Sequence, residues 1–363
     1  MKILFITGSL NQGGAEFQIL QLAKLFQDKE HEVEVFAITD YNFYKPLIEE
    51  YKLKYDHLFN HQSKIRRVLL TAKKIKKEKP EIMISYLKVP SQVALFAKII
   101  SGINSKLIIG ERTSFIQPLY DKFHFTLMRL SDFITVNSIT RLDQLKKDFP
   151  RLKNKIGFFP NIIDLDKFHF MEKNADPEIF KIGFVGRISP EKNVLNLIEA
   201  FKILFNDKSY LRLHIYGDTR NEDYLKKIKS LIVSYKLQDA VIFKGKYNNI
   251  IDAYQSIDLL CLISDYEGFS NVISEALSCG IPVITSNVEE NRFLIENKIN
   301  GFVVNHKDPD DIAKGINNYL KLDKGSKSKI AKANRLKSIR LFDKEVIYNN
   351  YMKIIKTLIA KNK

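Results

Sequence analysis

Cysteine is scarce in this chain of 363 residues, which holds only Cys261 and Cys279, both in apolar surroundings. Two such residues do not make a disulfide framework, so we expect buried thiols in a reducing compartment. Apolar runs of about 18 residues are lacking too, so the sequence predicts no membrane span. The opening Met1–Gly8 is apolar but short, and Asn11–Glu16 follows it without a cleavage pattern. We therefore interpret it as a buried strand rather than an export signal, and expect a cytoplasmic protein.

Several cofactor motifs are also missing. The spacing of Gly8, Gly13 and Gly14 does not form the G-x-G-x-x-G fingerprint of dinucleotide-binding folds. No His/Cys cluster offers metal-ligand spacing, so we expect neither a metal nor another cofactor. Signals of nucleic-acid-binding folds, such as zinc spacings or a helix-turn-helix, do not stand out.

Positive charge is abundant, with a formal net charge of +16. Residues 1–163 hold 26 Lys and Arg against 16 Asp and Glu, and the rest of the chain holds 32 against 26. This surplus in the first half favours an anionic partner there. We expect an anionic membrane surface rather than nucleic acid.

Apolar runs typical of buried strands alternate with helical patterns throughout the chain. This rhythm predicts an α/β protein with parallel sheets and crossover helices, repeated as two doubly wound units. The runs are Ile3–Thr7, Val33–Ile38, Ile82–Tyr86, Lys106–Ile109, Phe133–Asn137, Ile182–Phe184, Arg212–Tyr216, Val241–Phe243, Leu259–Ile263 and Pro282–Thr285.

The alternation breaks near residues 163–180, which predicts a domain boundary. We expect an N-terminal domain over residues 1–163 and a C-terminal domain over 164–342, with ligand bound in a cleft between them. Residues 343–363 form a terminal helix expected to pack back toward the N-terminal domain, or to lie on the surface of the second.

The segment Asp265–Cys279 carries two glutamates, Glu267 and Glu275, immediately after a predicted buried strand. Glu267 is expected on the strand-to-helix loop, and Glu275 about one turn into the following helix. The backbone N–H groups at such a helix start favour an anion. One carboxylate beside this site and another within reach of sugar hydroxyls suit a nucleotide-sugar.

Two cations follow another predicted strand end. Arg187 and Lys192 lie in the loop between Gly186 and Asn193, where they are placed to hold a diphosphate and to stabilise charge on a leaving group. The alternative is a pair of solvated surface charges. Likewise, Gly13 and Gly14 let the backbone approach a phosphate, or simply form a tight turn.

Taken together, these motifs resemble the retaining family-4 glycosyltransferases of GT-B fold, in which two Rossmann-like domains face each other across a cleft. The resemblance is carried by Gly13–Glu16, Gly186–Arg187 with Lys192–Asn193, and Glu267–Ser270 leading to Glu275. It implies transfer of a sugar from a nucleotide-sugar without a metal. The catalytic residues that it implies are Glu267, Arg187 and Lys192, and the donor-binding residues are Gly13, Gly14, Gly186, Lys246, Gly268, Phe269, Ser270, Asn271, Val272 and Glu275.

One position departs from the family. Many members have a histidine in the first-domain loop that faces the donor sugar, whereas this chain has Arg112, preceded by Glu111. An arginine cannot act as a base, but it can hold a sugar hydroxyl or an acceptor phosphate. Glu111 and Arg112 are therefore candidate acceptor or sugar contacts.

The clearest amphipathic stretch is Ser63–Glu78. Its residues Ile65, Val68, Leu69, Ala72 and Ile75 share one helical face, and seven of the others are Lys or Arg. It is interpreted either as a helix on anionic lipid or as a domain helix packed on the sheet. The aromatic stretch Phe115–Phe125 is a second candidate for a lipid boundary, or else a lid or acceptor wall.

These features predict a retaining hexosyl- or N-acetylhexosaminyltransferase peripheral to the inner membrane face. A UDP-sugar is the favoured donor, and a glycan or lipid-linked saccharide is the expected acceptor. Two alternatives remain open, namely a non-catalytic two-domain sugar- or nucleotide-binding protein and a hydride-transferring Rossmann enzyme. The missing dinucleotide fingerprint disfavours the latter.

Overall fold

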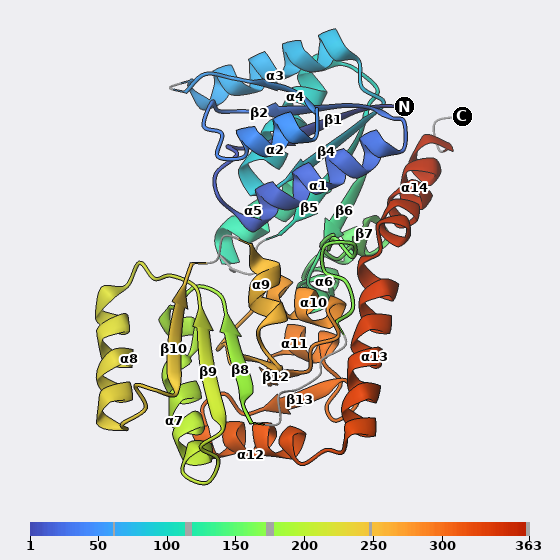
Figure 1. Cartoon of the computed structure of the whole chain (residues 1–363). Coiled ribbons are helices and arrows are strands. Elements are labelled where there is room, and N and C mark those ends of the chain that lie inside the picture. The colour runs from blue at the N-terminus through green and yellow to red at the C-terminus, as the bar shows by residue number, and fades with distance from the viewer. Residues whose placement is uncertain (61, 113–117, 172–177, 247–248, 361–363) are drawn as a thin grey trace. The chain divides into compact units, whose positions relative to one another are not determined.

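The chain folds into two compact units (Figure 1). The structure, a computed structural model, describes residues 1–60, 62–112, 118–171, 178–246 and 249–360. Unit 1 comprises Met1–Ile162 and Lys344–Lys363, and unit 2 comprises Ile163–Asp343. Each unit is built on one parallel β-sheet, so the predicted α/β class with two Rossmann-like domains is confirmed.

Unit 1 has a seven-stranded sheet in the order β3-β2-β1-β4-β5-β6-β7. The order reverses between β1 and β4, as in doubly wound folds, and loops at such a reversal commonly hold ligands. The strands are β1 (Lys2–Thr7), β2 (Glu32–Ala37), β3 (Lys54–His57), β4 (Ile82–Tyr86), β5 (Lys106–Glu111), β6 (Phe133–Val136) and β7 (Ile156–Phe158).

Helices cover both faces of this sheet because its strands are apolar on both sides. Along β1, Ile3 and Phe5 enter one core cluster, while Leu4 and Ile6 enter the other. The first cluster includes residues of α1 (Gly14–Asp28), α2 (Lys45–Glu50) and α14 (Lys344–Ala360). The second includes residues of α3 (Lys64–Glu78), α4 (Lys88–Ser101), α5 (Pro118–Met128), α6 (Ile139–Asp148) and η1 (Pro150–Lys155).

Unit 2 has a six-stranded sheet in the order β10-β9-β8-β11-β12-β13. Its strands are β8 (Phe180–Val185), β9 (Leu211–Tyr216), β10 (Val241–Gly245), β11 (Leu259–Leu262), β12 (Val283–Ser286) and β13 (Gly301–Val304). Its helices are η2 (Pro190–Lys192), α7 (Val194–Phe205), α8 (Glu222–Ser234), α9 (Ile250–Gln255), α10 (Asn271–Ser278), α11 (Glu289–Leu294), α12 (Pro309–Leu320) and α13 (Lys324–Phe342).

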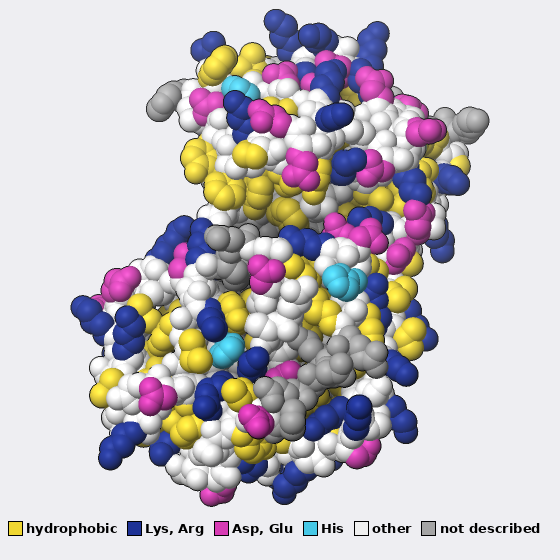
Figure 2. All heavy atoms as spheres, in the orientation of Figure 1, with side chains coloured by type: hydrophobic (Ala, Val, Ile, Leu, Met, Phe, Trp, Pro, Cys, Tyr) yellow, Lys and Arg dark blue, Asp and Glu magenta, His cyan; other side chains and the backbone are white. Residues whose placement is uncertain are grey.

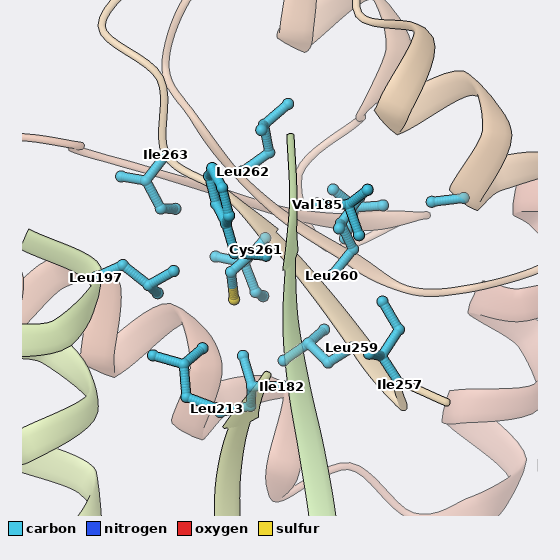
Figure 3. Packing of buried hydrophobic residues seen from close by; sticks show 14 of the residues in the cluster. Ile182, Val185, Leu197, Leu213, Ile257, Leu259, Leu260, Cys261, Leu262 and Ile263 are labelled. Atoms are coloured by element: carbon cyan, nitrogen blue, oxygen red, sulfur yellow. The ribbon is translucent and has the colours of Figure 1, made fainter. Parts of the chain in front are cut away.

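The core of unit 2 surrounds the central strands β8 and β11. Figure 3 shows successive β11 side chains on opposite sides of the sheet, with Cys261 toward Leu197 and Leu260 near Val185. Cys261 is fully buried and is a free thiol, as is Cys279. The predicted buried thiols are therefore present, and the rigid core fixes where the strand-end loops leave the sheet.

Candidate active site

The loop after β8 carries the two predicted cations of unit 2. Arg187 is exposed, and Lys192 ends the short η2 helix with a side chain that is 21% exposed. Asn193 then adopts the left-handed conformation (φ +54°), which turns the chain into α7. This turn puts the loop at the carboxyl end of β8, next to the loop that follows β11.

A close backbone approach holds this loop in place. Gly186 donates its N–H to the Tyr216 carbonyl (2.9 Å), and Ile188 donates to the Asp218 carbonyl (2.8 Å). Gly217 lies between these acceptors with φ +142°, and a Cβ there would lie 1.8 Å from the Gly186 carbonyl oxygen. The segment Tyr216–Asp218 at the end of β9 therefore fixes the position of the loop that carries Arg187, and only glycine fits at its centre.

Lys192 and Glu267 meet between the two neighbouring loops. Lys192 Nζ lies 2.6 Å from Glu267 Oε1, and the Ser264 hydroxyl donates to the same oxygen at 2.7 Å. The loops are also joined through the backbone, because Asp265 N–H donates to the Glu191 carbonyl at 2.9 Å. The geometry thus combines a cation and a carboxylate predicted separately from two distant motifs.

Glu275 lies about one turn into α10, as expected from the sequence. It is partly buried, and the fully buried Tyr254 of α9 donates its hydroxyl to Glu275 Oε2 at 2.7 Å. Burial raises the pKa of the Glu275 carboxyl to about 7, although the Tyr254 hydrogen bond and the charge of Lys167 oppose the shift. A carboxyl with a pKa raised in this way is typical of ligand-binding positions.

The start of α10 is shaped as an anion site. Ser270 is the N-cap, and its hydroxyl accepts the Ile273 N–H at 3.3 Å. Asn271 and Val272 form the first turn, whose N–H groups point out of the helix start. Gly268 precedes this turn, while the Phe269 ring packs edge-on against Phe342, 5.9 Å between ring centroids. The side chain of Phe269 therefore anchors the loop, and the donor contact of its backbone stays a prediction.

The remaining donor-binding predictions lie elsewhere. Lys246 is exposed just beyond β10, two strands away from β8 in the sheet order. Gly13 and Gly14 belong to unit 1, where Gly13 is the N-cap of α1 and its carbonyl accepts the Tyr44 hydroxyl at 2.9 Å. The Glu16 carboxylate lies against Gly13, and burial raises its pKa. This acidic side chain covers the helix start predicted to receive a phosphate.

Arg112 has structural partners within unit 1. Its guanidinium donates to the Phe159 carbonyl (2.9 Å) and to the Tyr86 hydroxyl (2.9 Å), and lies over the Tyr86 ring at 4.5 Å. A longer hydrogen bond, 3.4 Å, reaches Tyr351 of α14. Glu111 beside it is buried at the end of β5. These contacts give Arg112 a clear role in fixing α14 on the sheet, and its contact with a sugar or acceptor stays a prediction.

Sequence reasoning missed two side chains of this site. Ser264 and Tyr254 hydrogen-bond the two glutamates, yet neither belongs to a recognisable motif. The position of Ser264 directly after the buried β11 run was a usable signal. Tyr254 gave none, because only the packing of α9 beside α10 brings it to Glu275. Among the described residues, no group of three or more His, Cys, Asp or Glu is arranged to hold a metal ion.

Comparison with solved structures agrees with the fold. The chain superimposes on a glycosyltransferase from Rickettsia africae with a TM-score of 0.86 and 21% identity, covering 98% of each chain. It also superimposes on Anabaena HepE, solved in complex with UDP, with a TM-score of 0.84 and 20% identity over 98% of this chain and 100% of the other. The architecture is therefore the GT-B fold.

The sequence comparisons match glycosyltransferases. Residues 166–337, nearly all of unit 2, match the model of glycosyl transferases group 1. A Campylobacter jejuni relative, 27% identical over 87% of this chain and 88% of its own length, is GalNAc-α-(1→4)-GalNAc-α-(1→3)-diNAcBac-PP-undecaprenol α-1,4-N-acetyl-D-galactosaminyltransferase. Unit 2 therefore carries the group 1 glycosyltransferase match, and the chain as a whole is similar to named glycosyltransferases.

Proposed function

We propose that this enzyme is a retaining glycosyltransferase that moves a hexose or N-acetylhexosamine from a UDP-sugar to a lipid-linked saccharide. The observation that carries the proposal is the Lys192–Glu267 pair, flanked by Arg187 and by the start of α10 with Glu275. The name of the Campylobacter relative specifies an undecaprenyl-diphosphate-linked acceptor, and the HepE structure contains UDP. Both support this choice of donor and acceptor.

Each side chain has a defined task in the proposed reaction. Arg187 and Lys192 neutralise the diphosphate and stabilise the charge that grows on it as the sugar leaves, without a metal ion. Glu275 accepts hydrogen bonds from the ribose hydroxyls. Lys192 and Ser264 both contact Oε1 of Glu267, so we assign Oε2 to the hydroxyls of the donor sugar.

The bond changes follow from retention. The bond between the anomeric carbon and the diphosphate oxygen breaks, and UDP leaves with the electron pair. The acceptor hydroxyl attacks the same face of the sugar and gives its proton to the departing phosphate. No side chain is required as a base in this scheme, and the cations keep the leaving group in place.

Unit 1 has a surface suited to an anionic membrane, which we call the lipid surface. It consists of exposed apolar and basic side chains on three helices packed side by side, α3 against α4 and α4 against α5, and on the turn that follows α5. The apolar members are Ile65, Leu69, Val89, Phe96, Ile99, Ile100, Leu119, Phe123 and Leu130. The exposed basic members are Lys64, Arg66, Lys73, Lys76, Lys77, Lys122 and Arg129.

α3 packs on the sheet through one part of its apolar face and leaves another part exposed. Ala72 and Ile75 are buried against the sheet, whereas Ile65 and Leu69 on the same helical face are 75% and 51% exposed. The C-terminal half of the helix therefore anchors it on the sheet. The N-terminal half leaves apolar side chains exposed, where they are placed to enter the headgroup region of a membrane. Phe115 and the next two residues of the second predicted stretch lie outside the described residues. No helix in the described part of the chain is long and apolar enough to cross a membrane.

The direct test of the function is product analysis by mass spectrometry and NMR. The enzyme is incubated with UDP-glucose, UDP-galactose, UDP-GlcNAc and UDP-GalNAc, each with undecaprenyl-diphosphate-linked saccharides. We expect one donor to give an acceptor longer by one sugar, joined in the α-configuration. A β-linked product contradicts retention, and the absence of both product and UDP binding contradicts the proposal as a whole.

A further inference from the structure

Unit 1 carries a second exposed cluster, distinct in chemistry from the lipid surface. Phe17, Tyr41 and Phe43 are 36%, 54% and 46% exposed, and the half-buried Tyr44 contacts the rings of Phe17 and Phe43. The Tyr44 ring is 5.2 Å from that of Phe43 and 6.1 Å from that of Phe17. We call these four residues the aromatic platform. Figure 2 shows hydrophobic side chains gathered where α1 begins in unit 1.

Backbone pairing holds the platform rigid at the carboxyl edge of the sheet. Leu10 donates its N–H to the Tyr41 carbonyl (3.0 Å) and accepts the Phe43 N–H (2.8 Å), which joins the loops after β1 and β2 beyond the strands themselves. The Tyr44 hydroxyl donates a hydrogen bond to the Gly13 carbonyl, which joins the platform to the start of α1. Because the two loops are already held together by these hydrogen bonds, little conformational entropy is lost from them when a ligand binds.

The exposed side chains beside the platform favour a polar ligand. The exposed side chains of Asn11 and Gln12 lie in the same β1 loop, with Ser9 bonded to Asn11 at 2.6 Å. The exposed Lys45 that follows Tyr44 is paired with Glu49 across one helical turn. The lipid surface has many cations and mostly aliphatic side chains, whereas this platform has rings and amides. Rings offer flat apolar faces, and amides offer both donors and acceptors.

We propose that the aromatic platform is a saccharide subsite, on which Tyr41 and Phe43 stack against the apolar C–H face of a pyranose of the acceptor. Asn11 and Gln12 bind the hydroxyl or acetamido groups at the edge of that ring. This assignment rests on the proposed function and deepens it, because it names the residues of unit 1 that recognise the acceptor. A lipid chain or a protein partner on the platform is the competing outcome.

Saturation-transfer NMR tests the subsite directly. The probe is methyl α-N-acetylgalactosaminide, with sorbitol as a polyol that has hydroxyls but no ring face, and UDP is present throughout. We expect saturation of the C–H protons on one face of the sugar ring and none on sorbitol. The Tyr41→Ala/Phe43→Ala variant should lose this signal about fivefold or more, while Phe43→Tyr should retain it.

A control comes from Tyr210, a 40% exposed aromatic just before β9 in unit 2. Tyr210→Ala should leave the sugar signal unchanged. Equal signals from the wild type and the double variant, or no signal with the wild type, overturn the subsite. The melting shift induced by UDP is read in the same samples and reports the donor site alone. A lost sugar signal with an intact UDP shift supports the subsite, whereas a missing UDP shift counts against the proposed function instead.

Kinetics give a second, independent readout. With an acceptor that is elongated in the product assay, Tyr41→Ala/Phe43→Ala should raise the acceptor KM about tenfold and leave the KM for the UDP-sugar nearly unchanged. An increase confined to the UDP-sugar KM, or unchanged acceptor kinetics with altered binding to vesicles, contradicts a saccharide subsite.

Discussion

Lys192 Nζ and Glu267 Oε1 lie 2.6 Å apart, although 75 residues separate them in the chain. The pair brings the loops after β8 and β11 together at neighbouring strand ends. It also balances the charge of Glu267, whose side chain is only 10% exposed. In the proposed reaction, Lys192 turns from this carboxylate to the diphosphate, which links donor binding to the position of the loop after β11.

Removing the cation should abolish most transfer. We expect Lys192→Ala to lower kcat/KM about 100-fold or more, because it removes charge stabilisation of the leaving diphosphate and leaves Glu267 without its ion-pair partner. Lys192→Arg should restore part of the rate. Steady-state kinetics with circular dichroism checks this, and Lys226→Ala, an exposed lysine of α8, is the control. Full turnover by folded Lys192→Ala protein contradicts the assignment.

Glu275 should make stability depend on pH. Its pKa is raised from an ordinary 4.5 to about 7 in the folded protein, so the folded state binds more protons than the unfolded state between these values. Stability from this group is complete below about pH 4.5 and is lost as pH rises through about 7, by up to roughly 3 kcal/mol. Glu275→Gln should flatten the urea-unfolding free energy over this range. A slope equal to that of the wild type contradicts the shift.

UDP binding should titrate the same group. If the carboxylate accepts the ribose hydroxyls, UDP affinity should rise with pH up to about 7, and binding below that pH should release a proton. Calorimetry in buffers with different ionisation enthalpies measures the release, and Glu275→Gln should abolish it. Proton uptake on binding is the contrary result.

Gly217 should tolerate no side chain. A Cβ there meets the Gly186 carbonyl at 1.8 Å, and φ is +142°. Gly217→Ala should therefore lower the free energy of unfolding by about 1–3 kcal/mol and weaken UDP binding by displacing the Arg187 loop. Gly325→Ala on the exposed start of α13 is a suitable comparison, with a much smaller cost expected. A stable Gly217→Ala protein with normal UDP affinity refutes this role.

Charge reversal on α3 should release the enzyme from anionic vesicles. Changing Lys73, Lys76 and Lys77 to Glu removes about 1 kcal/mol of attraction for each lysine lost, and adds repulsion. Changing Lys226, Lys227 and Lys229 of α8 to Glu alters the net charge equally and should have little effect. Co-sedimentation with phosphatidylglycerol and phosphatidylcholine vesicles checks both. Equal recovery of the two variants means that the lipid surface is elsewhere.

The central strands could be predicted because each is a continuous apolar run buried on both faces. Three strands, β3, β7 and β13, had no counterpart among the predicted runs. β3 has the sequence Lys-Tyr-Asp-His, and β13 begins at Gly301. All three strands are short, and each lies at an edge of its sheet. A short strand at a sheet edge buries little apolar surface, so its sequence carries a weak signal.

The candidate site could be predicted residue by residue but not contact by contact. Strand-end motifs placed Arg187, Lys192 and Glu267 in loops, and Glu275 in the helix after such a loop, at the same edge of one sheet. Their partners depend on packing, because Tyr254 reaches Glu275 only when α9 and α10 lie side by side. For Arg112 the ligand contact stays a prediction, and its hydrogen bonds to Tyr86 and Phe159 are contacts that the sequence did not indicate.

Isothermal titration of UDP into the wild-type enzyme, Arg187→Ala and Lys192→Ala tests the central claim most directly. The account predicts a saturable heat for the wild type without added metal, and a Kd weakened about tenfold or more in each variant, as expected for the loss of a charge-assisted hydrogen bond. Unchanged affinity in both folded variants, or no UDP binding by the wild type, would contradict it.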